Sequence, residues 1–191
     1  MITFLDVETT FQINPDNRRS DPSPFHKDNK LVSVQYATGG DEPVFKWFHH
    51  QDMDVDPRVN HAAVQNTLHN TKLLVGHNIK FDLMWLWEAG FVYDGHVYDT
   101  MIAEYLLLRG QKWGVGLADS CARRKVSLKK SDLVEDYISN GIGFDKMPPE
   151  TVEEYGLADI ISTRELFLVH KELFNRDSNV PLRQHLRLMN N

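Results

Sequence analysis

The chain has 191 residues, of which 41% are hydrophobic and 25% charged, a composition typical of a folded globular protein. Its formal net charge of −6 argues against a protein that holds duplex DNA through positive charge alone. Cys121 is the sole cysteine, which excludes an intramolecular disulfide and a cysteine-rich zinc site. We therefore expect one domain over residues 1–191, in a reducing cytoplasmic setting. No apolar run reaches the length of a membrane span, and no signal for export is present, so we expect no membrane partner.

The first part of the chain predicts three strands. Residues 2–7 form a short apolar run with an acid near its end, which is typical of a buried strand. Residues 31–38 and 43–49 are strand-like and flank a Gly-Gly-Asp-Glu connection, so the three strands should form an antiparallel meander. The polar, proline-containing residues 11–30 lack periodicity and predict a long surface loop or insertion.

The remainder alternates helical and strand-like patterns. We expect a helix at about 57–69, a strand at 72–76, a helix at about 80–89, a short strand at about 96–98, and then helices, including a long one at about 150–174. This order predicts an α/β fold with a mixed central β-sheet flanked by helices. The tail at 175–191 opens with helix-breaking residues and could begin a connection to a further domain.

Two acids lie at the end of the first predicted strand. Asp6 and Glu8 are two residues apart, so their side chains face the same side of the strand and can reach one ion. Two like charges beside an apolar strand need a cation or a hydrogen-bond donor nearby. A solvated strand end is the alternative for a D-x-E pair that stands alone.

Two further pairs have a spacing of four residues. Asn78 and Asp82 follow a buried strand, where the turn into a helix brings both toward one cleft; a first-turn acid favoured by the helix dipole is the alternative. Tyr155 and Asp159 lie on one face of the long predicted helix. An ordinary amphipathic helix would explain that pair alone, but three such motifs in this order make coincidence a poor explanation.

These motifs, D-x-E, N-x3-D and Y-x3-D, resemble the DEDD superfamily of 3′→5′ exonucleases in its tyrosine subtype. The histidine subtype has H-x4-D, and Glu154 occupies that histidine's position here. The likeness covers residues 2–172 and is strongest to the proofreading domain of family A DNA polymerases, the bacterial polymerase I group and its phage relatives. The segments Tyr98-Asp99-Thr100-Met101 and Pro148-Pro149-Glu150 also look like those of this family.

The resemblance implies a ribonuclease H-like fold and an enzyme that hydrolyses phosphodiester bonds at the 3′ ends of DNA. It implies that single strands or frayed ends are preferred, that nucleoside 5′-monophosphates are released, and that proofreading is a role to consider. A phage-encoded member would work in the host-cell cytoplasm. An RNA-trimming exonuclease and a catalytically inactive nucleic-acid binding module remain alternatives, as do a free-standing enzyme and one linked to or associated with a DNA polymerase.

The resemblance also assigns roles to individual side chains. Two divalent cations, Mg²⁺ or Mn²⁺, would be held by carboxylates, which suit these hard ions. Tyr155 would orient the attacking water, Thr9 would contact the terminal nucleotide, and Asn78 would bind substrate and help to hold the strand or the ions. The four expected metal ligands are Asp6, Glu8, Asp82 and Asp159.

Other clusters have weaker signals. The basic run at 123–130 begins with Arg123, Arg124 and Lys125, which could contact a nucleic-acid backbone, although a solvated charged face is at least as plausible. Basic residues of the 11–30 segment form a second candidate patch with the same alternative, namely Arg18, Arg19, Lys27 and Lys30. The pairs His49–His50 and His61–His69 have poor spacing for one metal ion, so we expect surface or packing roles. Three tryptophans could stack on nucleic-acid bases, but we favour packing in the core for them: Trp85, Trp87 and Trp113.

Overall fold

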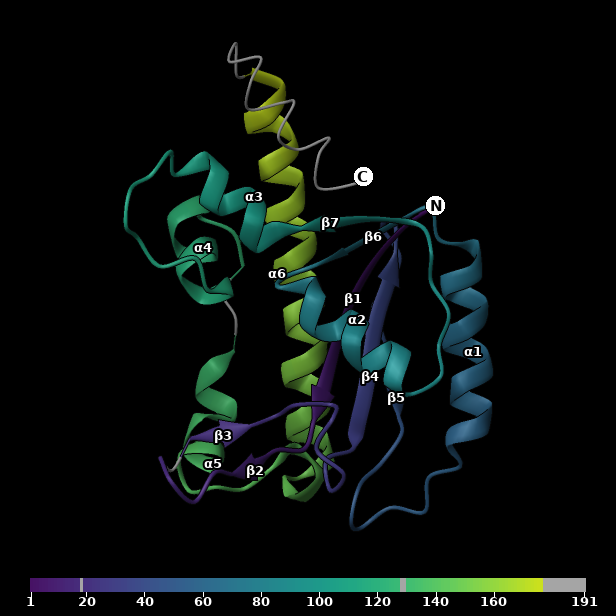
Figure 1. Ribbon diagram of the computed structural model, residues 1–191. Helices are drawn as coiled ribbons and strands as arrows, with labels where there is room; N and C mark the ends of the chain where they lie inside the picture. Colours follow the sequence, from purple (N-terminus) through teal and green to yellow (C-terminus); the bar gives the residue numbers. More distant parts are fainter. Residues whose placement is uncertain (18, 128–129, 177–191) are drawn as a thin grey trace.

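A twisted mixed sheet forms the centre of the protein in the computed structural model, which describes residues 1–17, 19–127 and 130–176 (Figure 1). Its strand order is β5-β4-β1-β6-β7. The strands are β1 (Ile2–Thr9), β4 (Leu31–Thr38), β5 (Val44–Trp47), β6 (Leu73–Gly76) and β7 (His96–Asp99). The strand β4 runs antiparallel to β1 and β5, whereas β6 runs parallel to β1 and β7. The predicted antiparallel meander and mixed sheet are therefore confirmed.

Helices cover both faces of this sheet (Figure 1). They are α1 (Pro57–Asn70), α2 (Ile79–Glu88), α3 (Thr100–Leu107), α4 (Leu117–Arg124), α5 (Glu135–Ser139) and α6 (Pro149–Arg176), with short 3₁₀ turns η1 (Ser131–Leu133) and η2 (Phe144–Lys146). The helices expected near 57–69, 80–89 and 150–174 are confirmed to within two residues at each end. The predicted tail falls outside the described residues from 177 onward. No helix in the described ranges is long and apolar enough to cross a membrane.

The alternation of side chains along β1 determines where the acids lie. Leu5 and Val7 point into a core shared with α1 and α2, whereas Phe4 packs on the opposite face with Ile160 and Phe167 of α6. Side chains two apart on a strand share a face. The acids at positions 6 and 8 therefore face α6, as the spacing predicts.

The segment 11–30 is more ordered than a loop. It contains a small antiparallel hairpin of β2 (Gln12–Ile13) and β3 (Ser20–Asp21), a detail that the expectation of a long surface loop or insertion did not include. The Trp85 indole nitrogen donates to the Pro22 carbonyl at 3.0 Å, which ties the segment to α2. Strands of two residues are too short to produce a periodic sequence pattern, which explains why the sequence did not predict them.

A buried ion-pair network joins three helices beside the sheet. Glu104 of α3 is fully buried and accepts from Arg123 at 2.6 Å and Arg124 at 2.9 Å, both in α4. The same carboxylate accepts from His170 Nε2 of α6 at 2.8 Å. Burial alone would raise the pKa of Glu104, but the hydrogen bonds from His170 and the two arginines outweigh it and lower that pKa to about 2. Glu104 is thus a charged anchor that fixes α4 against α3 and α6.

We predict that Glu104→Gln lowers the free energy of unfolding by about 3–5 kcal/mol at pH 7, because it leaves two partly buried arginines without their anion. Since the pKa of the folded state lies below the usual value of 4.5, the difference between wild type and variant should be complete above pH 4.5 and shrink as the pH falls toward 2. Urea unfolding from pH 6 to pH 3 measures this difference. Glu154→Gln is the matched control, since Glu154 pairs with Lys130 on the surface and its loss should cost less than about 1 kcal/mol. A difference that is small or independent of pH would contradict the anchoring role.

Candidate active site

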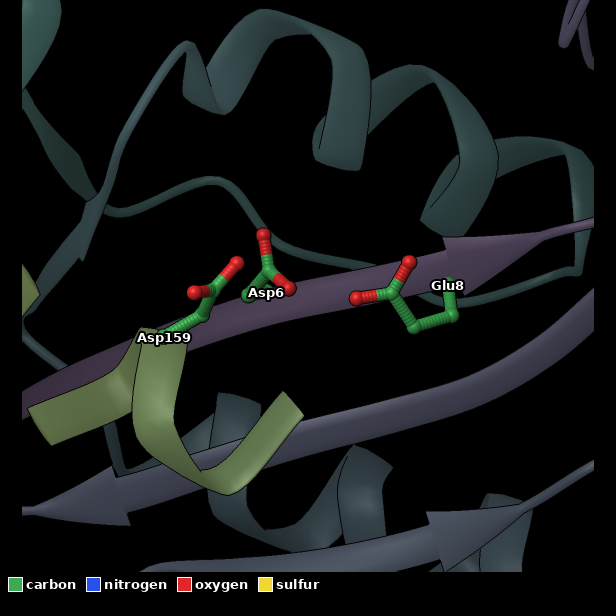
Figure 2. Close-up of side chains that lie close together, drawn as sticks. All are labelled: Asp6, Glu8 and Asp159. Atoms are coloured by element: carbon green, nitrogen blue, oxygen red, sulfur yellow. The ribbon is translucent and has the colours of Figure 1, made fainter. Parts of the chain in front are cut away.

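Three carboxylates converge on the face of β1 that is covered by α6 (Figure 2). Asp6 and Glu8 come from β1, and Asp159 comes from α6, with one potential ligand atom of each lying within 4.8 Å of those of the other two. Glu8 and Asp159 are buried, whereas Asp6 is half-buried. Among the described residues, this is the sole group of three or more His, Cys, Asp or Glu side chains with such spacing. The structure therefore brings together three of the four acids expected to bind metal.

The fourth acid, Asp82, lies in the first turn of α2 and approaches β1 from the β6 side of the sheet. Its Oδ1 accepts the Val7 N–H at 3.0 Å. The strand β6 pairs only with Ile2–Phe4 of β1. The Val7 N–H lies beyond this pairing and can therefore donate to Asp82. Burial and then the charge of Asp6 raise the pKa of Asp82 well above its usual value, with the Val7 hydrogen bond acting in the opposite direction. Asp82 thus interacts electrostatically with the cluster, although it is not one of the three converging carboxylates.

Tyr155 lies one helical turn before Asp159 on α6, as its spacing predicts, and is almost fully buried. Its ring packs on Phe144 of η2, with the centroids 5.6 Å apart. Burial, followed by the negative charges of the three clustered acids and a hydrogen bond with Asp159, raises the pKa of Tyr155. The side chain is therefore a neutral phenol at physiological pH, able to donate a hydrogen bond but unsuited to act as a base.

A buried aspartate fixes the turn that leads to Asp82. Asp99, at the end of β7, accepts from the backbone of Met101 at 2.8 Å and caps α3. The same Oδ1 accepts from the Asn78 backbone at 3.0 Å. Asp99 therefore connects β7, α3 and the turn between β6 and α2, which is a structural role for the Asp-Thr-Met segment noted in the sequence.

The two residues expected to contact substrate lie at the end of β1 and immediately before α2. Thr9 is buried at the end of β1, where the pairing with β4 shifts register after Glu8. Asn78 is exposed in a left-handed conformation, with φ of 62°, immediately before α2, and its side chain makes no helix-capping hydrogen bond. Substrate contact stays a prediction for both.

Two of the three basic residues expected to contact nucleic acid form ion pairs within the protein. Arg123 and Arg124 pair with Glu104, as described above, and Arg123 also lies 5.3 Å from the centre of the Trp113 ring. Lys125 is exposed at the C-terminal cap of α4. Contact of these three residues with a nucleic-acid backbone remains a prediction, while residues 18, 128 and 129 of the two basic segments lie outside the described residues.

The predictions for the tryptophans and histidines are confirmed for some residues and wrong for others. Core packing is confirmed for Trp85 and is wrong for Trp87 and Trp113, both of which are exposed. His50 is buried, with its Nε2 at 2.9 Å from the Met147 carbonyl oxygen. His61 stacks on Phe91 with ring centres 4.1 Å apart, which is a packing role.

The donor set of the cluster suits a divalent cation. All three converging groups are carboxylates, and hard ions such as Mg²⁺ and Mn²⁺ prefer oxygen ligands. Negative groups brought together in a partly desolvated place are costly unless a cation or donors compensate them. One donor is Gln35 of β4, whose Nε2 lies 2.6 Å from Asp6 Oδ2. Gln35 was not among the predicted site residues, because β4 also contains the polar Ser33 and Thr38 and its sequence does not single out Gln35.

Comparison with known proteins agrees with this arrangement. A family model described as 3′-5′ exonuclease matches residues 19–173. The chain belongs to the 3′-5′ exonuclease family. The matched segment begins after β1 and does not include Asp6 or Glu8. These two acids are connected to the matched segment by their proximity to Asp159 in the structure. DNA polymerase I of Aquifex aeolicus is 31% identical over 107 residues, which are 56% of this chain and 17% of that protein. The chain thus corresponds to a small part of that relative.

Solved structures of other exonucleases share the fold. Brucella melitensis NrnC with bound Mg²⁺ superposes with a TM-score of 0.63 and 19% identity, covering 98% of this chain and 81% of that one. Exonuclease X in complex with 5′ overhanging duplex DNA has a TM-score of 0.51 and 14% identity, covering 93% and 95% of the two chains. The expected ribonuclease H-like fold, with its mixed sheet flanked by helices, is confirmed.

We predict that Asp6→Asn makes the protein more stable in the absence of metal and insensitive to its addition. The substitution removes one of several like charges while keeping an oxygen that accepts from Gln35, so the melting temperature in EDTA should rise by about 2–4 °C, corresponding to roughly 1 kcal/mol. Mg²⁺ should raise the melting temperature of wild type and leave that of the variant unchanged. Thermal unfolding with and without Mg²⁺ measures both effects, with exposed Asp54→Asn as the control. Equal stabilisation of wild type and Asp6→Asn by Mg²⁺ would place the ion elsewhere.

Proposed function

We propose that the protein is a metal-dependent 3′→5′ exonuclease that hydrolyses phosphodiester bonds at the 3′ ends of DNA, prefers single-stranded or frayed ends, and releases nucleoside 5′-monophosphates. The observation that carries the proposal is the convergence of Asp6, Glu8 and Asp159 in a chain of the 3′-5′ exonuclease family. A binding module without catalysis would have no use for acids that repel both one another and the phosphate backbone.

Two divalent cations are the cofactors that this site fits. The residues that would hold them are the three converging acids, with Asp82 beside Asp6, and the Mg²⁺ in the related NrnC structure supports this assignment. When bound, such ions supply positive charge that favours deprotonation of water and stabilises the negative charge developing on the phosphate and the leaving oxygen. Mg²⁺ and Mn²⁺ both suit an all-carboxylate donor set.

The protein's own groups orient the reactants. The neutral phenol of Tyr155, whose proton is directed at Asp159, can accept a hydrogen bond from the attacking water through its oxygen and so orient it beside phosphorus. Water then forms the new bond to phosphorus and gives up a proton to solvent, while the bond to the 3′-oxygen of the preceding nucleotide breaks and that oxygen takes up a proton from solvent. Thr9 at the end of β1 and Asn78 before α2 are the proposed contacts to the terminal nucleotide.

A polar cavity of about 180 Å³ beside the end of β1 offers a path for the nucleic-acid strand. Its lining includes Thr10, two residues beyond Glu8, and side chains of both charges, namely Lys30 and Lys146 with Asp28 and Asp145. The ammonium groups of Lys30 and Lys146 are exposed cations that can attract backbone phosphates in a protein that is acidic as a whole. Arg123, Arg124 and Lys125 of α4 and its C-terminal cap are a second proposed contact.

DNA is the proposed substrate because the sequence relative is a DNA polymerase, at 31% identity over the aligned segment. RNA trimming is the rival function, and the related NrnC structure bound to pGG makes it worth a direct comparison. Residues 1–191 are proposed to form one exonuclease domain. Proofreading would require that this domain be covalently linked to, or associated with, a DNA polymerase.

The decisive assay follows nucleotide release from single strands of identical sequence in DNA and RNA. We expect Mg²⁺-dependent release that begins at the 3′ end, faster cleavage of DNA than of RNA, and slower cleavage of blunt duplex, since the terminal pairs must open first. Faster cleavage of RNA would favour the rival function. Cleavage of circular single-stranded DNA would reveal an endonuclease, and binding without cleavage would indicate an inactive module.

The same assay separates the roles of two residues on one face of α6. Tyr155→Phe removes one hydrogen bond to the water, worth about 0.5–1.5 kcal/mol, and should reduce the rate roughly tenfold. Asp159→Ala removes a charged ligand and should reduce it much further, with partial recovery at high Mn²⁺. If Tyr155→Phe were equally damaging at every metal concentration, the phenol would do more than orient water.

A further inference from the structure

The fully buried side-chain amide of Gln35 lies next to two of the clustered carboxylates. Gln35 of β4 is opposite Asp6 in the antiparallel ladder, and its exposed fraction is 0%. Its Nε2 donates to Asp6 Oδ2 at 2.6 Å and contacts Glu8 Oε1 at 3.4 Å. A single amide group therefore bridges the two acids that β1 contributes to the site.

Neighbouring groups fix the orientation of this amide. The Ser33 hydroxyl, which is opposite Glu8 in the same ladder, donates to Gln35 Oε1 at 3.1 Å. The reversed orientation would place the amide oxygen against the Asp6 carboxylate and lose its donor. Ser33 is itself fully buried, so the polar pair has no access to solvent and must be satisfied within the protein.

The helix that carries Tyr155 and Asp159 closes over the same amide. A methyl group placed on Gly156 would lie 3.0 Å from both Cδ and Nε2 of Gln35, tighter than ordinary van der Waals contact. Glycine at this position lets α6 approach β4 closely. The Gln35 amide is therefore held between β1 and α6 at the point where their acids meet.

We propose that Gln35 is a positioning residue that aligns Asp6 and Glu8 for metal binding before any ion arrives. This inference rests on the proposed function. A neutral donor shared by two carboxylates reduces their repulsion without competing for the site as a cation would. It also restricts carboxylate rotation, so less side-chain freedom is lost when the ion binds.

Titration of the metal-free protein with Mn²⁺ tests the proposal without relying on activity. The electron paramagnetic resonance signal of free Mn²⁺ measures how much of the ion remains unbound and gives the dissociation constant. Gln35→Met keeps a straight chain of similar size and removes the amide. We expect its Mn²⁺ dissociation constant to rise about 10–100-fold. Thr3→Val is the matched control, because Thr3 is also fully buried on β1 and hydrogen-bonds to Thr71 at 2.6 Å, away from the site. It should lower the melting temperature and leave the dissociation constant unchanged.

Ser33→Ala provides a milder second variant, should Gln35→Met fold poorly. It removes the hydroxyl that orients the amide and should raise the Mn²⁺ dissociation constant at least threefold. Activity should show the same pattern, with more Mg²⁺ needed for half-maximal rate and a rate at saturating Mg²⁺ within a few-fold of wild type. Dissociation constants within twofold of wild type in both variants, or an equal rise in Thr3→Val, would overturn the proposal. Failure of wild type to bind Mn²⁺ would overturn the proposed function itself.

Discussion

Carboxylates that are crowded at one point of the sheet repel one another, and the surrounding elements hold them there. Asp6, Glu8 and Asp159 bring their oxygens within 4.8 Å of one another, and Asp82 lies near enough for the charge of Asp6 to raise its pKa. Repulsion of this kind favours either separation of the groups or the uptake of protons or cations. The fold prevents separation, and the resulting all-carboxylate donor set is one that suits a divalent cation.

Several contacts oppose that separation. The backbone of Val7 donates to Asp82, the Gln35 amide bridges the two acids of β1, and Asp99 holds the turn that begins α2. On the opposite side, the long helix α6 lies beside β1 (Figure 1) and carries Tyr155 and Asp159 one turn apart on one face. Its position is secured in turn by the buried Glu104 network, which connects it to α3 and α4. The Glu104 network therefore helps to hold the helix that carries Asp159.

Features governed by local pattern were predictable from the sequence. Strand and helix periodicity located the main elements, and the two-residue spacing on β1 and four-residue spacing on α6 predicted which acids face one another. Features that depend on distant partners were not predictable. The internal pairing of Arg123 and Arg124 requires Glu104, which lies 19 and 20 residues earlier on another helix. Gln35 contacts Asp6 across 29 residues, and nothing in its immediate neighbours indicates this contact. The relation of Asp82 to the other acids also required the structure, because α2 approaches β1 from a different side than α6.

Anomalous diffraction from a crystal of the wild-type protein soaked in Mn²⁺ tests most directly the central claim that this cluster binds two catalytic cations. We expect two anomalous peaks at the cluster of Asp6, Glu8 and Asp159, with Asp82 beside Asp6 as a further ligand. Absence of peaks at this cluster at millimolar Mn²⁺, or peaks confined to other acidic residues on the surface, would contradict it.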